Sequence, residues 1–192
     1  MKPEEKNHHL YVMLSMTGTL PSRVLQGKMK GQYSHCSISL DRNLHHMFSF
    51  GRLIKYIFIP GGMVHELPFR NVYSRYKHTI CAIYEVPVTE EQYYKAEAMI
   101  KRLWKNRRKL RYNFPGILAA NFKHYPEIPN HYYCTQFVAR ILKKSGVNFT
   151  EKKYVETDIF DFQNAKDFNL IYEGELRDYW NSYCAEGIFK KY

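Results

Sequence analysis

The chain has 192 residues, of which 45% are hydrophobic and 24% charged, and its net charge is +11. This length and composition exclude a disordered chain and suffice for one globular domain that buries a core without disulfide bonds. The four cysteines are widely separated, with neither the spacing of metal ligands nor the density of a disulfide framework, so the sequence predicts no metal and no cofactor.

The excess of Lys and Arg bears on the partners of the protein rather than on its fold. A dense basic run over residues 101–111 would suit anionic lipid, a cell-wall polymer or nucleic acid, although a solvated helix end is the simpler explanation. The sequence lacks zinc-ligand spacing, an aromatic RNA-binding signature and a glycine-rich phosphate loop, so no specific nucleic-acid partner is predicted.

Because no apolar run is long enough to span a membrane and the N-terminus does not resemble a secretory signal, we expect a cytoplasmic protein. We also expect a flexible leader over residues 1–8 and a single domain over residues 9–192.

In chain order, hydrophobic periodicity, capping residues and turn residues predict alternating strands and helices. Strands are expected over residues 9–16, 33–40, 44–51, 63–68, 78–86 and 170–172, with a turn at residues 60–62. Helices are expected over residues 20–30, 90–106, 117–122, 134–145 and 156–162. The mixture predicts an α+β fold.

The strands before and after residues 41–43 form a predicted β-hairpin. With a three-residue turn, Leu40 faces Leu44 and His35 lies opposite Ser49. Period-two alternation then gives one polar face and one largely apolar face. The residues expected on the polar face are His35, Ser37, Ser39, His45, Met47 and Ser49.

Cys134 begins an amphipathic helix that ends at Gly146. Unpaired backbone N–H groups and the positive end of the helix dipole favour a thiolate there, and the thiolate is the nucleophilic form of cysteine. A buried cysteine that acts only as a small hydrophobic residue is the alternative. A base close to Cys134 would favour the nucleophile over the buried packing residue.

His35 is the candidate base, since a histidine on a polar strand face and a cysteine at a helix start form the thiol–imidazole pair of papain-like hydrolases. Alternatively, His35 is a structural histidine. A third polar group must orient the imidazole, and the predicted register gives this place to Ser49, with His45 and Glu66 as weaker candidates. Aromatic residues could line a cleft at this site. The candidate substrate-binding residues are Tyr33, Tyr112, Tyr133 and Gln136.

Four stretches together resemble the circularly permuted NlpC-like papain fold, which includes YiiX-type amidases and lecithin retinol acyltransferase-like proteins. These stretches are SHCSISLD (34–41), MFSFGR (47–52), RYNFPGI (111–117) and HYYCTQFVARILKKSG (131–146). The resemblance implies a papain-like antiparallel sheet packed against helices, with the nucleophile-bearing helix late in the chain, Cys134 as nucleophile and His35 as base. It departs at the third position, where YiiX-type proteins have Glu and the acyltransferase relatives have His, whereas Ser49 is expected here.

The resemblance implies cleavage of an amide in a peptide or cell-wall fragment through a thioester acyl-enzyme, or acyl transfer on a lipid. Two other functions remain open. The first is a non-catalytic module that binds an anionic ligand through its basic surface. The second is a thiol-redox sensor in which Cys36 forms a disulfide with Cys134.

Overall fold

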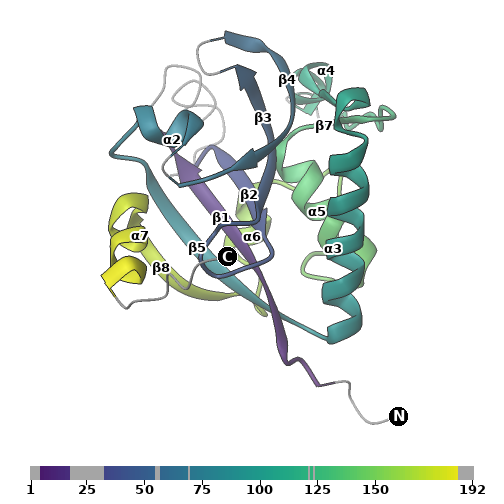
Figure 1. Cartoon of the computed structure of the whole chain (residues 1–192). Helices are drawn as coiled ribbons and strands as arrows, with labels where there is room; N and C mark the ends of the chain where they lie inside the picture. Colours follow the sequence, from purple (N-terminus) through teal and green to yellow (C-terminus); the bar gives the residue numbers. More distant parts are fainter. Residues whose placement is uncertain are drawn as a thin grey trace.

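Figure 1 shows the computed structural model of the chain, which describes residues 5–17, 33–54, 57–68, 70–120, 122 and 124–185. Its centre is a six-stranded antiparallel sheet with the strand order β4-β3-β2-β1-β5-β8. The strands of this sheet are β1 (His8–Met16), β2 (His35–Ser39), β3 (Met47–Ile54), β4 (Ile57–Glu66), β5 (Ile80–Val88) and β8 (Asn169–Glu175). A short parallel ladder pairs β6 (Arg111–Tyr112) with β7 (His131–Tyr132). The helices are α2 (Asn71–Arg75), α3 (Glu90–Lys105), α4 (Phe114–Ala120), α5 (Cys134–Ser145), α6 (Ile159–Gln163) and α7 (Leu176–Ala185), with a 3₁₀ turn η1 (Arg107–Lys109) after α3.

Helices cover both faces of the sheet (Figure 1). The larger core lies where α3 and α5 pack on one face, and it includes Leu10, Val12 and Leu14 of β1. A smaller core on the other face lies beneath α2 and α7 and includes Met13 of β1. Because β1 is buried on both faces, its sequence is a continuous apolar run rather than an alternating one.

The helices with local sequence signals agree with the predictions. Thr89 caps α3 and accepts a hydrogen bond from the backbone N–H of Gln92, while the Gln92 side chain accepts one from the N–H of Thr89. Helix α5 begins at Cys134 and ends at Gly146, whose φ of 97° is the left-handed conformation that glycine adopts readily. The predicted helix over residues 20–30 lies outside the described residues.

Two predictions about the hairpin region are wrong. Residues 60–62 are not a turn but part of β4, an edge strand in which the missing N–H of Pro60 needs no partner in the sheet. The hairpin register is also shifted by two residues, because Ser39 pairs with Met47 and Leu40 N–H donates to His46 C=O. A shift of two residues keeps each strand side chain on its predicted face but moves Ser49 two positions along the strand from the place opposite His35.

The longer hairpin loop has a local cause. The two carboxylate oxygens of Asp41 accept hydrogen bonds from the backbone N–H groups of His45 and His46, at 2.9 and 2.8 Å. Leu44 adopts a φ of 60° and is fully buried in the smaller core. Side-chain capping by Asp41 and burial of Leu44 therefore replace the tight three-residue turn.

The sheet begins at the last position of the predicted leader. Strand β1 begins at His8, the last residue of the predicted leader, and the His8 ring packs against Tyr93 of α3 with the ring centres 5.3 Å apart. Among the described residues, no helix is long and apolar enough to cross a membrane.

Candidate active site

The start of α5 carries the candidate nucleophile. Cys134 is the first residue of the helix, and its side chain is 8% exposed. The first N–H groups of a helix have no acceptor within the helix, so they are available to an anion close to this sulfur. The Gln136 side chain stabilises the same turn, since its amide oxygen accepts hydrogen bonds from Tyr133 N–H at 3.2 Å and from the Asn113 amide at 3.1 Å.

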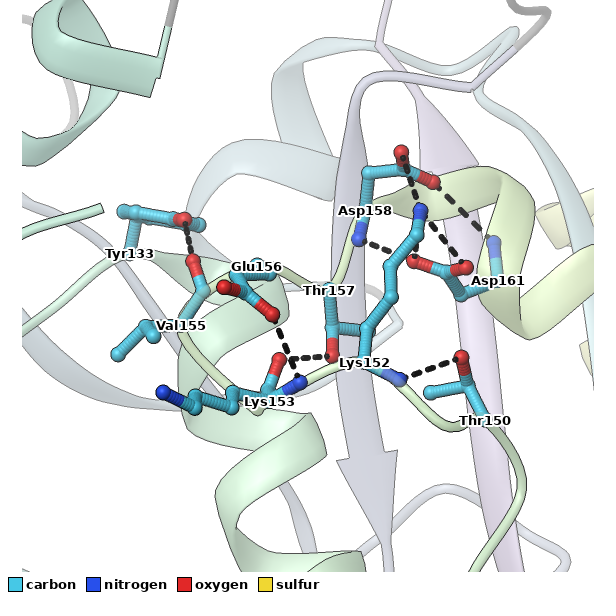
Figure 2. Close-up of polar contacts among 9 residues, drawn as sticks. All are labelled: Tyr133, Thr150, Lys152, Lys153, Val155, Glu156, Thr157, Asp158 and Asp161. Atoms are coloured by element: carbon cyan, nitrogen blue, oxygen red, sulfur yellow. Dashed lines mark hydrogen bonds and ion pairs between the residues drawn. The ribbon is translucent and has the colours of Figure 1, made fainter. Parts of the chain in front are cut away.

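A loop on the other side holds Tyr133 in place. Its hydroxyl donates to the Val155 carbonyl oxygen at 2.8 Å, as Figure 2 shows. The loop is ordered in turn by Lys152, whose ammonium group pairs with Asp158 at 3.3 Å and with Asp161 at 2.9 Å at the start of α6. The residue before the cysteine is therefore fixed by contacts on both its backbone and its side chain.

His35, at the start of β2, contacts the sulfur and a carboxylate. Its Nε2 lies 2.9 Å from Oε1 of Glu66 on β4, and the same imidazole interacts with the Cys134 side chain. Burial lowers the pKa of His35, but the negative charge of Glu66 and then the interaction with Cys134 outweigh it and raise the pKa to about 10. These contacts favour the imidazolium form at neutral pH.

Glu66 is the centre of a buried hydrogen-bond network. Ser49 donates to its Oε1 at 2.8 Å, and Ser37 and Tyr73 donate to its Oε2 at 2.6 and 3.1 Å. Its side chain is only 13% exposed, and burial by itself would raise the pKa of the carboxyl group. The charge of His35 and these hydrogen bonds reverse that effect and hold the pKa of Glu66 below its usual value.

The structure corrects the predicted partner of the imidazole. Ser49 is on the expected face, but its hydroxyl bonds to Glu66, which is the residue that contacts the His35 ring. Glu66 reaches this position because it pairs with Met47 across β3 and β4, on the face that carries the serines. His45 is in the hairpin loop, where its ring packs against Trp180.

The candidate substrate-binding residues separate into two groups. Tyr133 directly precedes Cys134, and Tyr112 pairs with Tyr132 in the short ladder; burial first and Cys134 second raise the pKa of each phenol. Tyr33 is buried, and its hydroxyl donates to Glu173 on β8 at 2.5 Å. Gln136 is buried and uses its amide oxygen within the chain, as described above.

The sequence pattern contained signals for some of the residues that the predictions missed. Asn113 is fully buried, and its side-chain oxygen accepts the N–H of Gly116 at 2.9 Å, which caps α4. The sequence Asn-Phe-Pro-Gly at residues 113–116 is typical of such a helix start. No comparable local signal indicates Tyr73, since its contact with Glu66 depends on how β4 leads into α2.

Cys36 and Cys81 are free thiols like Cys134, but they are fully buried. Burial, and then the nearby Cys134 and Glu66, raise the pKa of Cys36, so its thiolate is strongly disfavoured. Among the described residues there is no cluster of His, Cys, Asp or Glu that could hold a metal ion. In this site the imidazole lies between a thiol and a carboxylate, an arrangement that can carry out nucleophilic catalysis.

No protein-family model matches this sequence, and no curated protein matches it.

Proposed function

We propose that the protein is a cysteine hydrolase that cleaves amide bonds, built on a papain-like domain of the permuted NlpC type. One observation carries the proposal: Cys134, His35 and Glu66, from α5, β2 and β4, form a continuous series of interactions. An imidazole between a thiol and a carboxylate can remove the thiol proton and is then stabilised as a cation. A purely structural histidine would not require a cysteine at a helix start on one side and a carboxylate on the other.

In the proposed reaction, the Cys134 sulfur attacks the carbonyl carbon of the substrate as a thiolate, after its proton has passed to His35. A C–S bond forms and the carbonyl electron pair moves to oxygen, where N–H groups in the first turn of α5 stabilise the negative charge. The C–N bond then breaks, and the His35 imidazolium gives its proton to the leaving amine. Water, deprotonated by His35, finally attacks the thioester and releases the carboxylic acid and the thiol.

Glu66 acts as a positioning residue in this scheme. Its carboxylate holds the ring through Nε2, which leaves the other ring nitrogen for the sulfur. Ser49 and Ser37 in turn hold the carboxylate, so the serine predicted to contact the imidazole acts one step further away. A charged carboxylate stabilises the imidazolium more strongly than a serine hydroxyl can.

Selective alkylation tests the nucleophile. We expect iodoacetamide to label Cys134 near neutral pH far faster than Cys36 or Cys81, because Cys134 is 8% exposed and interacts with an imidazole, whereas the other two are fully buried. The variant His35→Ala should remove this difference, and His46→Ala, which changes an exposed histidine, should not. Peptide mass spectrometry follows the labelling of each cysteine. Equal labelling rates at Cys36, Cys81 and Cys134 would reject the proposed nucleophile.

Hydrolysis itself is tested with a panel of N-acyl aminocoumarin amides and matching p-nitrophenyl esters. We expect turnover of an amide, with a thioester adduct on Cys134 that mass spectrometry detects. Cys134→Ala should abolish turnover, whereas Cys81→Ala should retain it. Turnover of esters alone would favour the lipid acyl hydrolase or acyltransferase alternative, and turnover that survives Cys134→Ala would rule out the mechanism.

A further inference from the structure

The positive charge of this protein is concentrated in one segment. Residues 98–126 contain eight Lys or Arg and no Asp or Glu, so this stretch accounts for +8 of the net charge of +11. It covers the second half of α3, η1, β6 and α4. A local excess of this size produces a strong positive potential on one part of the surface.

All seven described cations of this stretch are exposed, and the six other than Lys101 form what we call the basic segment. Its members are Arg102, Lys105, Arg107, Arg108, Lys109 and Arg111. In the described parts of the chain, none of the six pairs with a carboxylate, whereas Lys95 and Lys101 of the same helix pair with Glu91 and Glu97 at 2.5 and 2.8 Å. The basic segment therefore keeps its charge available for a partner.

Several of these side chains are held in place by neutral groups. The Arg107 guanidinium lies 4.4 Å from the centre of the Trp104 ring and donates to the Trp104 carbonyl oxygen at 3.0 Å. Arg111 donates to the carbonyl oxygens of Arg108 and Leu110 at 2.6 and 2.9 Å. These contacts order the guanidinium groups without neutralising them, which lowers the entropy lost when an anion binds.

An apolar element follows the basic segment directly. Helix α4 has the sequence FPGILAA, without a charged residue. Phe122, just after this helix, is 84% exposed, the largest exposure among the large hydrophobic residues of the described chain. The C-terminal end of α3, helix α4 and β7 lie together at one end of the molecule (Figure 1). Cations next to an exposed apolar group are typical of proteins that bind a bilayer surface.

We propose that the basic segment and Phe122 form a docking surface for an anionic lipid bilayer. The cations contact lipid phosphate groups, and the Phe122 ring enters the interface between headgroups and acyl chains. An anionic polymer in water would attract the same cations but would gain little from an exposed phenyl ring beside them.

The docking surface adjoins the candidate active site. Arg111 is followed by Tyr112, whose pKa is raised by burial and then by Cys134. Tyr112 also lies against β4, since a Cβ at Gly61 would be 2.7 Å from the Tyr112 Cβ. Docking by this end of the molecule would bring the sulfur close to molecules in the membrane. The docking proposal does not depend on the hydrolase proposal and can be tested separately.

Vesicle cosedimentation tests the proposal with the full chain. We expect binding to vesicles of phosphatidylcholine with 30% phosphatidylglycerol, no binding to phosphatidylcholine alone, and weaker binding as salt rises. The triple variant Arg107→Gln/Arg108→Gln/Lys109→Gln should bind roughly a hundredfold more weakly, because each cation near an anionic surface contributes about a fivefold factor. The matched control, Lys144→Gln/Lys153→Gln/Lys166→Gln, removes three exposed charges elsewhere and should bind within about twofold of the wild type.

A second variant tests the apolar part of the surface. Phe122→Ser should weaken vesicle binding about tenfold or more, because the variant loses an aromatic ring that would be buried in the bilayer. It should leave binding to a labelled DNA duplex unchanged. Circular dichroism confirms that each variant is folded. Equal losses in the two triple variants, full vesicle binding by Phe122→Ser, or DNA binding in place of vesicle binding would each overturn the proposal.

Discussion

Replacing Glu66 by Gln removes the charge beside His35 and nearly preserves the size of the side chain. Burial lowers the pKa of His35, but Glu66 and then Cys134 raise it from 6.5 to about 10. A rise of this size corresponds to about 5 kcal/mol in favour of the imidazolium. Because Glu66 is the strongest of the groups that raise the pKa, we expect the pKa of His35 in Glu66→Gln to fall by roughly 1 to 3 pH units.

Proton NMR of the imidazole Hε1 resonances measures this pKa directly, and His35→Gln identifies the signal of His35. The same titration in Cys134→Ala isolates the effect of Glu66 from that of the thiol. Glu175→Gln is the matched control, since Glu175 pairs with the exposed His78 at 3.0 Å and lies outside the Glu66 network. A wild-type His35 that titrates near 6.5, or one that is unaffected by Glu66→Gln, would refute the proposed role of the carboxylate.

Three further predictions concern stability. The pKa of His35 is raised and that of Glu66 is lowered on folding, so their contribution is fully present from about pH 4.5 to 6.5 and is lost as the pH rises through about 10. In urea unfolding, the free energy of unfolding of the wild type should exceed that of His35→Gln/Glu66→Gln, and this difference should decrease as the pH rises toward 10. A difference that does not change with pH would contradict the ion pair. Gly61→Ala should destabilise by about 1 to 3 kcal/mol and slow alkylation of Cys134, because its Cβ would lie 2.7 Å from that of Tyr112; an unchanged melting temperature would exclude this close approach. Gln136→Leu should destabilise by about 2 to 4 kcal/mol in the same urea assay, since it leaves two buried donors without an acceptor.

The elements whose signals are local could be predicted from the sequence. Helix α5 was predicted from its periodicity and from Gly146, and α3 from its cap at Thr89. In both, the residues that define the ends lie within a few positions of the helix that they terminate. The position of Cys134 at a helix start therefore required no knowledge of the tertiary structure.

The hairpin register could not be predicted in this way. The turn residues indicated a reversal near Asp41, but the loop length depends on two backbone N–H groups that bind the Asp41 carboxylate and on burial of Leu44 against other elements. The wrong register does not change which face each strand residue occupies, because a shift of two residues leaves every side chain on the same face. The shared face of His35, Ser37 and Ser49 was thus predicted correctly, whereas His45 lies in the loop and the residue opposite His35 was predicted wrongly.

The partner of the imidazole could have been found by asking what the buried serines bind. Ser37 and Ser49 are fully buried, and a buried hydroxyl without a hydrogen-bond partner is costly. A strand face that combines several serines with a histidine therefore requires an acceptor able to serve more than one of them, and a carboxylate has two oxygens for this purpose. Glu66 is the sole acidic residue between Asp41 and Glu85. A turn at residues 60–62 would separate Glu66 from the strands that carry the serines. Because β4 instead continues through these residues to Glu66, the carboxylate lies on the same face as Ser37 and Ser49 and binds both hydroxyls and the imidazole.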